Sequence, residues 1–193
     1  TGLDLIIEIN KKGKTIWTWF ANENGYFVDP KGRIRNINKK INHRYKSYPT
    51  LQQVIHLNST IEVGHTKYFE NTLYSSFFHQ GKIVAINKKN GKKIEVLKNL
   101  KHPHSLYLIS GRVIISDTEN KSFIIANKNL DKIKRIKIKG VNWIQDVTKL
   151  KNNNFLISDP DKNRLLEYSL NEGIVGKFKF DKEWRIYQAK QVK

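Results

Sequence analysis

Short polar segments containing histidine, amide and acidic residues recur along this sequence, and their residue types suit catalysis. Three of them read His56-Leu57-Asn58-Ser59, His102-Pro103-His104-Ser105 and Trp143-Ile144-Gln145-Asp146. A further segment near the C-terminus supplies Arg185, Tyr187 and Gln188. Imidazoles, a carboxylate and a guanidinium that meet at one place could carry out general acid–base or nucleophilic chemistry on an anion.

The candidate ligand site depends on these segments converging in space. Its predicted members are His56, Asn58, His104, Ser105, Gln145, Asp146, Arg185 and Tyr187. A single histidine in such a segment is more often a hydrogen-bonded structural residue than a catalyst. The site therefore requires a fold that brings all the segments to one point.

A repeat of roughly 40 residues supplies strands that could bring the segments together. Its clearest copies are the tetrads Leu73-Tyr74-Ser75-Ser76, Ile114-Ile115-Ser116-Asp117 and Leu156-Ile157-Ser158-Asp159. Each tetrad follows a polar segment and precedes a second apolar run, a polar turn and a third strand-like run. Four strands at this period are typical of one blade of a β-propeller. Innermost strands line the central channel of a propeller, so residues at their starts would meet at its mouth.

The predicted fold is all-β: a β-propeller of four-stranded antiparallel blades, either with about four blades or as part of a larger propeller. We predict one domain over residues 1–193, with blades at 54–101, 102–142 and 143–183. A further blade is split between residues 1–20 and 184–193, and pairing of the two ends would hide edge strands. The second strand of this split blade is missing. The chain is therefore either a small ring with one incomplete blade or a fragment of a larger propeller.

Residues 21–53 interrupt the repeat and form a basic insertion. Its cations are Lys31, Arg33, Arg35, Lys39, Lys40, Arg44 and Lys46, and its tyrosines are Tyr26, Tyr45 and Tyr48. The insertion is either a solvated crossover loop or a lid that contacts a polyanion beside the channel mouth, because loops on rigid scaffolds often carry function.

The chain is strongly basic, with a formal net charge of +19 from 36 Lys and Arg against 17 Asp and Glu. Such a field attracts polyanions and says nothing about fold. The expected partner is an anionic small molecule or a polyanion, although abundant Lys, Asn and Ile also fit compositional drift. Nucleic acid belongs to this class of partner, but no recognition motif for it is present.

Features that the sequence lacks exclude several kinds of site. The sequence has no Cys, which excludes disulfides, thiolate metal sites and a cysteine nucleophile. It contains no run of about 18 apolar residues, so no membrane span is expected. A metal site built from His56, His102, His104 and Asp146 is an alternative, but its spacing matches no ligand motif and no metal is expected.

Other repeated residues have structural explanations. Asp117, Asp159 and Asp161 follow a buried strand, where a carboxylate can accept backbone N–H bonds of the next turn. The tryptophans fall at repeat positions at which they would pack between blades; they are Trp17, Trp19, Trp143 and Trp184.

Taken in order, several segments resemble those of the arylsulfotransferase-type propellers. They are Glu8 to Trp19, His56-Leu57-Asn58-Ser59, Leu73 to Ser76, Lys82 to Gly91, Pro103-His104-Ser105, Asn153 to Ile157 and Tyr187-Gln188-Ala189. The likeness runs over most of the chain. Its most specific part is the His-x-Asn-Ser element followed by a strand with a Ser-Ser pair.

This resemblance implies a propeller, six-bladed in characterised members, that moves a sulfuryl group between phenols through a histidine and needs no cofactor. By this likeness His104 is the candidate nucleophile and His56 helps to hold the sulfate, so these two are the predicted catalytic residues. An imidazole can take the sulfuryl group while neighbouring cations stabilise its oxygens.

One position departs from the family pattern. The family has an arginine directly after the Ser-Ser pair, where this chain has Phe77. Without that guanidinium the sulfuryl oxygens lose a bidentate partner, and Arg185 is the candidate substitute.

The sequence therefore predicts a propeller that binds a sulfated or phosphorylated ligand at the channel mouth, with group transfer through a histidine. Two alternatives stay open. One is a non-catalytic binding propeller, and the other is a protein that holds nucleic acid or another polyanion through bulk positive charge.

Overall fold

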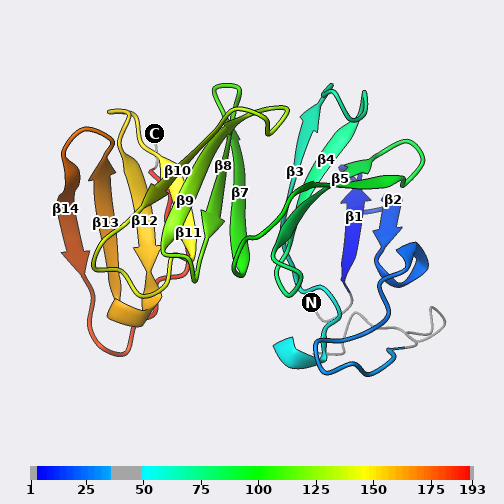
Figure 1. Ribbon diagram of the computed structural model, residues 1–193, viewed down its shortest axis with the longest axis horizontal. Coiled ribbons are helices and arrows are strands. Elements are labelled where there is room, and N and C mark those ends of the chain that lie inside the picture. Colours follow the sequence, from blue (N-terminus) through cyan, green and yellow to red (C-terminus); the bar gives the residue numbers. More distant parts are fainter. Residues whose placement is uncertain (1–3, 36–48, 192–193) are drawn as a thin grey trace.

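The computed structural model describes residues 4–35 and 49–191, which form four antiparallel sheets arranged side by side (Figure 1). A two-stranded sheet contains β1 (Leu5–Ile9) and β2 (Thr15–Phe20). The first blade contains β3 (Leu57–Gly64), β4 (Thr72–Phe77), β5 (Lys82–Asn87) and β6 (Lys93–Leu97). The second blade contains β7 (Pro103–Ile109), β8 (Arg112–Asp117), β9 (Ser122–Asn127) and β10 (Ile133–Lys137). The third blade contains β11 (Asp146–Lys149), β12 (Phe155–Asp159), β13 (Arg164–Ser169) and β14 (Gly173–Lys179).

Within each blade the strands follow chain order, and each is antiparallel to the next. The prediction of an all-β fold with four-stranded antiparallel blades is confirmed. The first strands of the three blades contact one another, β3 with β7 and β7 with β11. They therefore hold the innermost positions, and the starts of these strands carry the candidate site residues.

In the first and second blades the second strand is the most deeply buried, because neighbouring sheets cover both of its faces. Every residue of β4 is buried, as is every residue of β8 except the first, whereas the outermost strand β6 is mostly exposed. A strand covered on both faces needs apolar or small residues without alternation. This burial explains the nearly continuous apolar tetrads in the sequence.

The core lies between the blades. One cluster, which includes Tyr74 and Ile115, joins the first blade to the second. Another, which includes Phe123 and Ile157, joins the second blade to the third. A third cluster, around Trp19, joins the two-stranded sheet to the first blade. The orientation of each blade thus depends on side chains of its neighbours.

The predicted packing role of the tryptophans is confirmed for two of them. Trp19 is buried in the core and Trp17 packs against the same cluster. The prediction is wrong for Trp184, which is 63% exposed. Trp184 lies in the segment after β14, where no further sheet among the described residues covers it.

A hydroxyl contact repeated between blades fixes the spacing of the innermost strands. Ser76 donates a hydrogen bond to the carbonyl of His104 at 3.3 Å. Ser116 donates in the same way to the carbonyl of Gln145 at 3.4 Å. Each serine lies in a second strand, and each carbonyl lies at the start of the next blade. The repeat therefore positions the backbone of two candidate site residues.

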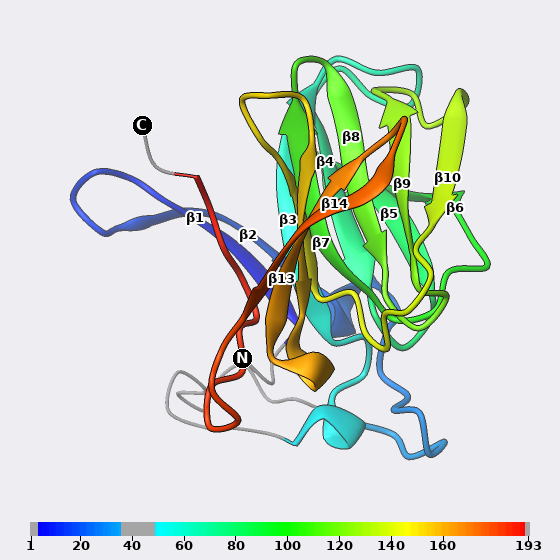
Figure 2. The ribbon, with the colours of Figure 1, turned by 90° about the vertical axis from the view of Figure 1, so that its left-hand side faces the viewer.

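The same contact occurs once more, beyond the third blade. Ser158 donates to the carbonyl of Ile186, although residues 180–191 form no regular strand (Figure 2). Gln188 in this segment also donates to the hydroxyl of Tyr107 at 2.7 Å. The C-terminal segment therefore lies where an innermost strand would lie, beside β11.

The two-stranded sheet corresponds to the outer half of a blade. Gly81, Lys121 and Asn163 directly precede third strands and have positive φ angles. The carbonyl of each accepts a backbone bond from a residue within three positions after the fourth strand. Asp4, which precedes β1, has the same conformation and the same kind of bond. The split blade stays a prediction, because β1 pairs with β2 and the C-terminal segment contacts the second and third blades.

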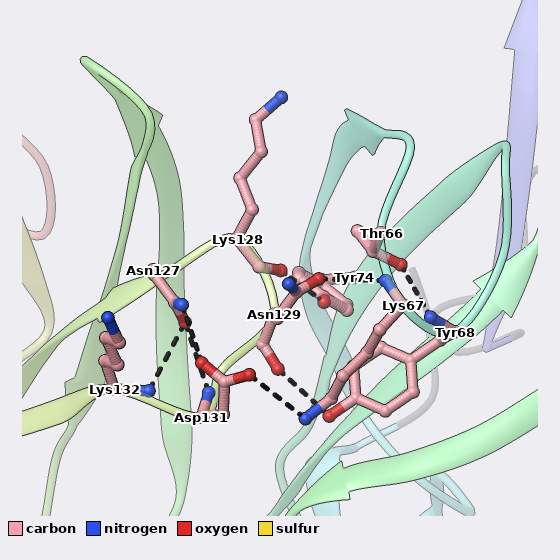
Figure 3. A network of polar contacts seen from close by, with 9 residues as sticks. All are labelled: Thr66, Lys67, Tyr68, Tyr74, Asn127, Lys128, Asn129, Asp131 and Lys132. Carbon is pink, nitrogen blue, oxygen red and sulfur yellow. Dashed lines mark hydrogen bonds and ion pairs between the residues drawn. The ribbon is translucent and has the colours of Figure 1, made fainter.

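A polar network at the loop between β3 and β4 ties the first blade to the second (Figure 3). The hydroxyl of Tyr74 donates to the carbonyl of Lys128 at 2.6 Å, and Tyr68 donates to that of Asn129 at 3.0 Å. Lys67 forms a 3.3 Å ion pair with Asp131. These bonds hold the turn between β9 and β10 against the first blade, which restricts sliding between the two sheets.

Part of the basic insertion is described. It includes the 3-10 helices η1 (Asn22–Asn24) and η3 (Thr50–Gln52), and a turn in which Asp29 binds both Arg33 and Arg35. The predicted cations and tyrosines at Lys39, Lys40, Arg44, Lys46, Tyr45 and Tyr48 lie outside the described residues. The role of the insertion as a lid stays a prediction.

No helix in residues 4–35 and 49–191 has the length and apolar character needed to cross a membrane.

Candidate functional site

The predicted site residues line two adjoining cavities at the starts of the innermost strands. The mouth pocket has a volume of about 460 Å³, and the predicted residues in its wall are His56, His104, Gln145, Arg185 and Tyr187. The axial groove has a volume of about 410 Å³, and its predicted residues are Asn58, His104, Ser105, Gln145, Asp146 and Tyr187. His104, Gln145 and Tyr187 line both cavities. The structure thus brings all eight residues into one region, while their ligand-binding roles stay predictions.

Buried aspartates position the chain where it enters the innermost strands. Asp117 accepts a 2.7 Å bond from the N–H of Lys101, and Asp159 accepts a 3.3 Å bond from that of Trp143. Asp4 binds the backbone ahead of β3 in a similar way. Asp117 and Asp159 thus accept backbone N–H bonds, as predicted, but the donors lie ahead of the first strand of the same blade and not in the turn that follows each aspartate.

His104 carries its proton on Nδ1. This atom lies 3.1 Å from the carbonyl of His102 and 2.9 Å from the hydroxyl of Thr118. The Thr118 hydroxyl itself donates to the carbonyl of Ile144 at 2.8 Å, so both neighbours of Nδ1 are acceptors. In the neutral ring Nε2 therefore bears a lone pair, which is the form required of a nucleophile or a general base.

His56 is held in a similar state. Its Nδ1 lies 2.5 Å from the amide oxygen of Gln53, which can only accept. The neutral ring of His56 then also has a lone pair on Nε2. Both predicted catalytic histidines are thus hydrogen-bond acceptors, so neither one supplies the positive charge that an anion would need.

Burial keeps both imidazoles neutral. The pKa of His56 is lowered from 6.5 to about 4, mainly by desolvation and then by the nearby His79. The pKa of His104 is lowered from 6.5 to about 4, again mainly by desolvation. A buried imidazolium loses its hydration, so the uncharged ring is favoured.

We expect His104 to stay neutral throughout the range from pH 5 to 8, and to titrate near pH 4. The unfolded chain protonates at an ordinary value near 6.5. The contribution of this residue to folding is therefore complete above about pH 6.5 and is lost as the pH falls toward 4. NMR titration of ¹³C-labelled histidine, with His104→Asn to assign the signal, measures the value. A midpoint above 6 would contradict the burial argument.

Aromatic rings form the wall that buries these histidines. The ring centroid of Phe78 lies 4.9 Å from that of His56 and 4.9 Å from that of His104. Phe78 also stacks on His102 at 4.0 Å, and Trp143 contacts His104 at 5.5 Å. Sequence reasoning missed Phe78 as a site residue. The available signal was its place directly after the Ser-Ser strand that matches the family pattern.

The residue at the position where the predicted resemblance would place an arginine is not in the site. Phe77 is fully buried and packs against Trp19 and Tyr26 at the interface with the two-stranded sheet. Arg185 is the one arginine or lysine in the wall of the mouth pocket as the described residues form it. Asp161, assigned by sequence to a turn, lies in the 3-10 helix η4 (Pro160–Lys162) and also lines this pocket.

Two residues in the wall of the axial groove carry polar atoms that lack hydrogen-bond partners within the described chain. They are the amide nitrogen Nδ2 of Asn58 and the carboxyl oxygen Oδ1 of Asp146. Asp146 is 5% exposed, and burial raises its pKa, an effect opposed by contacts with Tyr107 and Ser105. Buried polar atoms are nearly always satisfied. Both atoms are closed off from solvent, so the groove does not expose them to a ligand.

The described residues contain no group of three or more His, Asp or Glu side chains placed to hold a metal ion. His102, one of the candidate ligands, instead has its Nδ1 2.6 Å from Glu119. Its ring stacks on Phe78 and lines neither the mouth pocket nor the axial groove.

No family model matches the chain, and no curated protein matches it. Solved structures of β-propellers do match. Virginiamycin B lyase from Staphylococcus aureus is 17% identical over 92% of this chain, with a TM-score of 0.54. Its catalytically inactive histidine-to-alanine variant with quinupristin is 16% identical over 93%, with a TM-score of 0.55. A protein of unknown function from Bacteroides caccae is 15% identical over 90%, with a TM-score of 0.58.

This chain has a β-propeller fold. It spans 57% to 63% of the length of these three matched structures. Such low identities show the fold alone. The arylsulfotransferase resemblance stays a prediction, because none of these comparisons supports that family in particular.

Proposed function

We propose that this propeller binds an anionic, sulfated or phosphorylated ligand at the channel mouth and transfers the anionic group through His104. The observation that carries the proposal is the lone pair on Nε2 of His104, fixed by two acceptors at Nδ1, in a pocket that also contains Arg185. A neutral imidazole is a competent nucleophile, and a guanidinium can stabilise the oxygens of the transferred group.

The transfer proceeds in two balanced steps. In the first, Nε2 of His104 forms a bond to sulfur while the bond from sulfur to the donor phenol oxygen breaks, releasing a phenolate. In the second, an acceptor phenol attacks the sulfur and loses its proton to Nε2 of His56, and Nε2 of His104 leaves as a neutral imidazole. His56 then returns the proton to solvent, where the released phenolate takes one up. The net change moves one sulfuryl group and one proton between phenols. The bonds from Nδ1 to His102 and Thr118 stabilise the cationic intermediate.

Arg185 and His56 have different roles in the proposed transfer. Arg185 contacts the anionic oxygens, since the imidazoles are neutral and cannot supply charge. His56 accepts the proton of the attacking phenol through its free Nε2. No cofactor is needed for either step. A catalytically inactive histidine-to-alanine variant exists for a matched propeller, which supports the use of a histidine on this fold.

A non-catalytic binding propeller is the second candidate. The observation that favours it is the loss of the family arginine, because Phe77 points into the core and leaves Arg185 as the pocket's guanidinium. The exposed side chain of Arg185 binds an anion more weakly than a buried cationic pair would. Binding through bulk charge is the remaining alternative, since the chain carries a net charge of +19.

Release of nitrophenol from nitrophenyl sulfate, with phenol as acceptor, tests the proposal. We expect turnover by the unaltered chain, no turnover above background by His104→Ala, and nearly normal turnover by His102→Ala. His102 is the matched control, because it lies beside the same phenylalanine but outside both cavities. Equal background rates in all three proteins would rule out group transfer.

Ligand binding is measured separately, with nitrophenyl sulfate titrated into Arg185→Gln and Lys182→Gln. Loss of one charged hydrogen bond predicts about a tenfold rise in Kd for Arg185→Gln alone. That result without turnover would support the binding propeller. Equal losses in both variants, with the same steep salt dependence for heparin and DNA, would indicate bulk charge.

A further inference from the structure

A third cavity, which we call the basic groove, lies away from the mouth pocket and the axial groove. It has a volume of about 660 Å³ and includes the β7–β8 turn and residues from β8 to β11 and the β13–β14 turn. Ile109 in its wall is at the end of β7, whereas His104 lies near the start of that strand. Five residues of strand separate them, about 16 Å. The basic groove is therefore distinct from the candidate site.

Four cationic side chains line the basic groove: Arg112, Lys132, Lys134 and Lys149. Within the described part of the chain, none of these side chains forms an ion pair or a hydrogen bond with the protein. No carboxylate lines the cavity with them. Unneutralised like charges raise the local positive potential and attract an anionic partner.

The nearest carboxylate in the sequence is already occupied. Asp131 precedes Lys132 but pairs with Lys67 of the first blade at 3.3 Å (Figure 3). It also accepts a 2.6 Å bond from the amide of Asn127. These contacts lower the pKa of Asp131, so it stays charged and committed to the inter-blade network. The cations of the basic groove are thus left for an external partner.

The floor of the basic groove is aliphatic. It is formed by Ile109, Ile114, Ile125, Ile133 and Leu170. Ile133 is 44% exposed and Leu170 is 43% exposed, so apolar surface is open to a ligand. No aromatic ring lines this cavity, and a floor without rings offers nucleobases no stacking platform.

We propose that the basic groove binds an acidic segment of a partner protein that also carries aliphatic side chains. The cations come from separate places, β8, β10 with the turn before it, and β11. Such a spread suits several separate carboxylates better than one compact head group. The aliphatic side chains of the segment pack on Ile133 and Leu170 and supply the specificity that bulk charge lacks.

Synthetic peptides of eight residues with a fluorescent label test this proposal. The first alternates Glu with Leu, the second alternates Glu with Ser, and the third alternates Gln with Leu. By fluorescence anisotropy we expect the Glu–Leu peptide to bind at least tenfold more tightly than either control. The reason is that both the charge and the apolar contact contribute. If the Glu–Ser peptide binds equally well, bulk charge accounts for binding and the proposal fails.

Charge-matched variants locate the binding surface. Arg112→Glu with Lys134→Glu should weaken binding of the Glu–Leu peptide at least tenfold. Lys11→Glu with Lys12→Glu changes the net charge equally in the exposed turn between β1 and β2 and should change Kd less than twofold. Equal effects of the two pairs would overturn the proposal.

Two further probes test other classes of ligand for the basic groove. They are an oligodeoxythymidine, for nucleic acid, and vesicles that contain phosphatidylserine, for a membrane surface. The proposal also fails if Arg112→Glu with Lys134→Glu weakens binding of either of these probes but not binding of the Glu–Leu peptide. Circular dichroism melting of both double variants verifies that they are folded before binding is measured.

Discussion

Asp159→Ala is expected to lower the free energy of unfolding by about 3–5 kcal/mol, because it leaves a buried guanidinium without its partner. Asp159 is fully buried and Arg164 is 8% exposed. The carboxylate accepts bonds from Nε and Nη2 of Arg164 at 2.9 and 2.7 Å. It also accepts the backbone bond from Trp143, which lines the mouth pocket. The variant should therefore loosen the pocket as well as the third blade.

Chemical denaturation with urea measures the effect of Asp159→Ala. Asp161→Ala is the matched control, since it removes a nearby exposed carboxylate and should change stability by less than about 0.5 kcal/mol. The double variant Asp159→Asn with Arg164→Met removes both charges and should recover part of the loss. A change below 1 kcal/mol in the single variant would show that the ion pair is dispensable.

Gly81→Ala is expected to destabilise the first blade by about 3 kcal/mol, because a β-carbon at this position has no room. An ideal Cβ on Gly81 would lie 2.2 Å from the carbonyl oxygen of Leu100. Its φ of 58° is also unfavourable for a residue with a side chain. Gly81 accepts the backbone bond from Leu100 that ends the blade, so the clash and the bond involve the same pair of residues.

The repeat provides an internal control for Gly81→Ala. Lys121 occupies the equivalent place in the second blade, with a φ of 53° and a similar backbone bond from Ile138. Lys121→Gly removes a side chain from this strained conformation and should be neutral or slightly stabilising. Thermal melting curves of both variants measure these changes in stability. A melting temperature for Gly81→Ala within a few degrees of that of the unaltered chain would contradict the predicted clash.

Much of the fold could be predicted from the sequence, because the strand-forming runs are local. The tetrads containing Ser76, Ser116 and Ser158 mark buried second strands, and their serines make the same contact at three successive places. A repeated local pattern gives a repeated local structure, so equivalent positions could be aligned without coordinates. The final contact also shows where the C-terminal segment lies, although no strand forms there.

The sequence indicated which polar residues lie in the candidate site, but not their protonation states or hydrogen bonds. His56 and His104 could be placed near the axis from the repeat, but their proton positions depend on Gln53 and Thr118, which carry no motif. The wall formed by Phe78 was missed, because its place after the Ser-Ser strand was the only signal and a phenylalanine has no catalytic group of its own. Charge state and hydrogen bonding depend on residues distant in sequence.

The sequence by itself determined the strand period, the blade architecture and the set of residues near the axis, because these follow from the local alternation of apolar runs, turns and polar segments. The tertiary structure alone decided what those residues can do. Contacts between blades remove water from His104, bury unpaired polar atoms of Asn58 and Asp146, and bring together the cations of the basic groove. Desolvation and charge crowding depend on which distant surfaces cover a residue, and local sequence does not encode that directly.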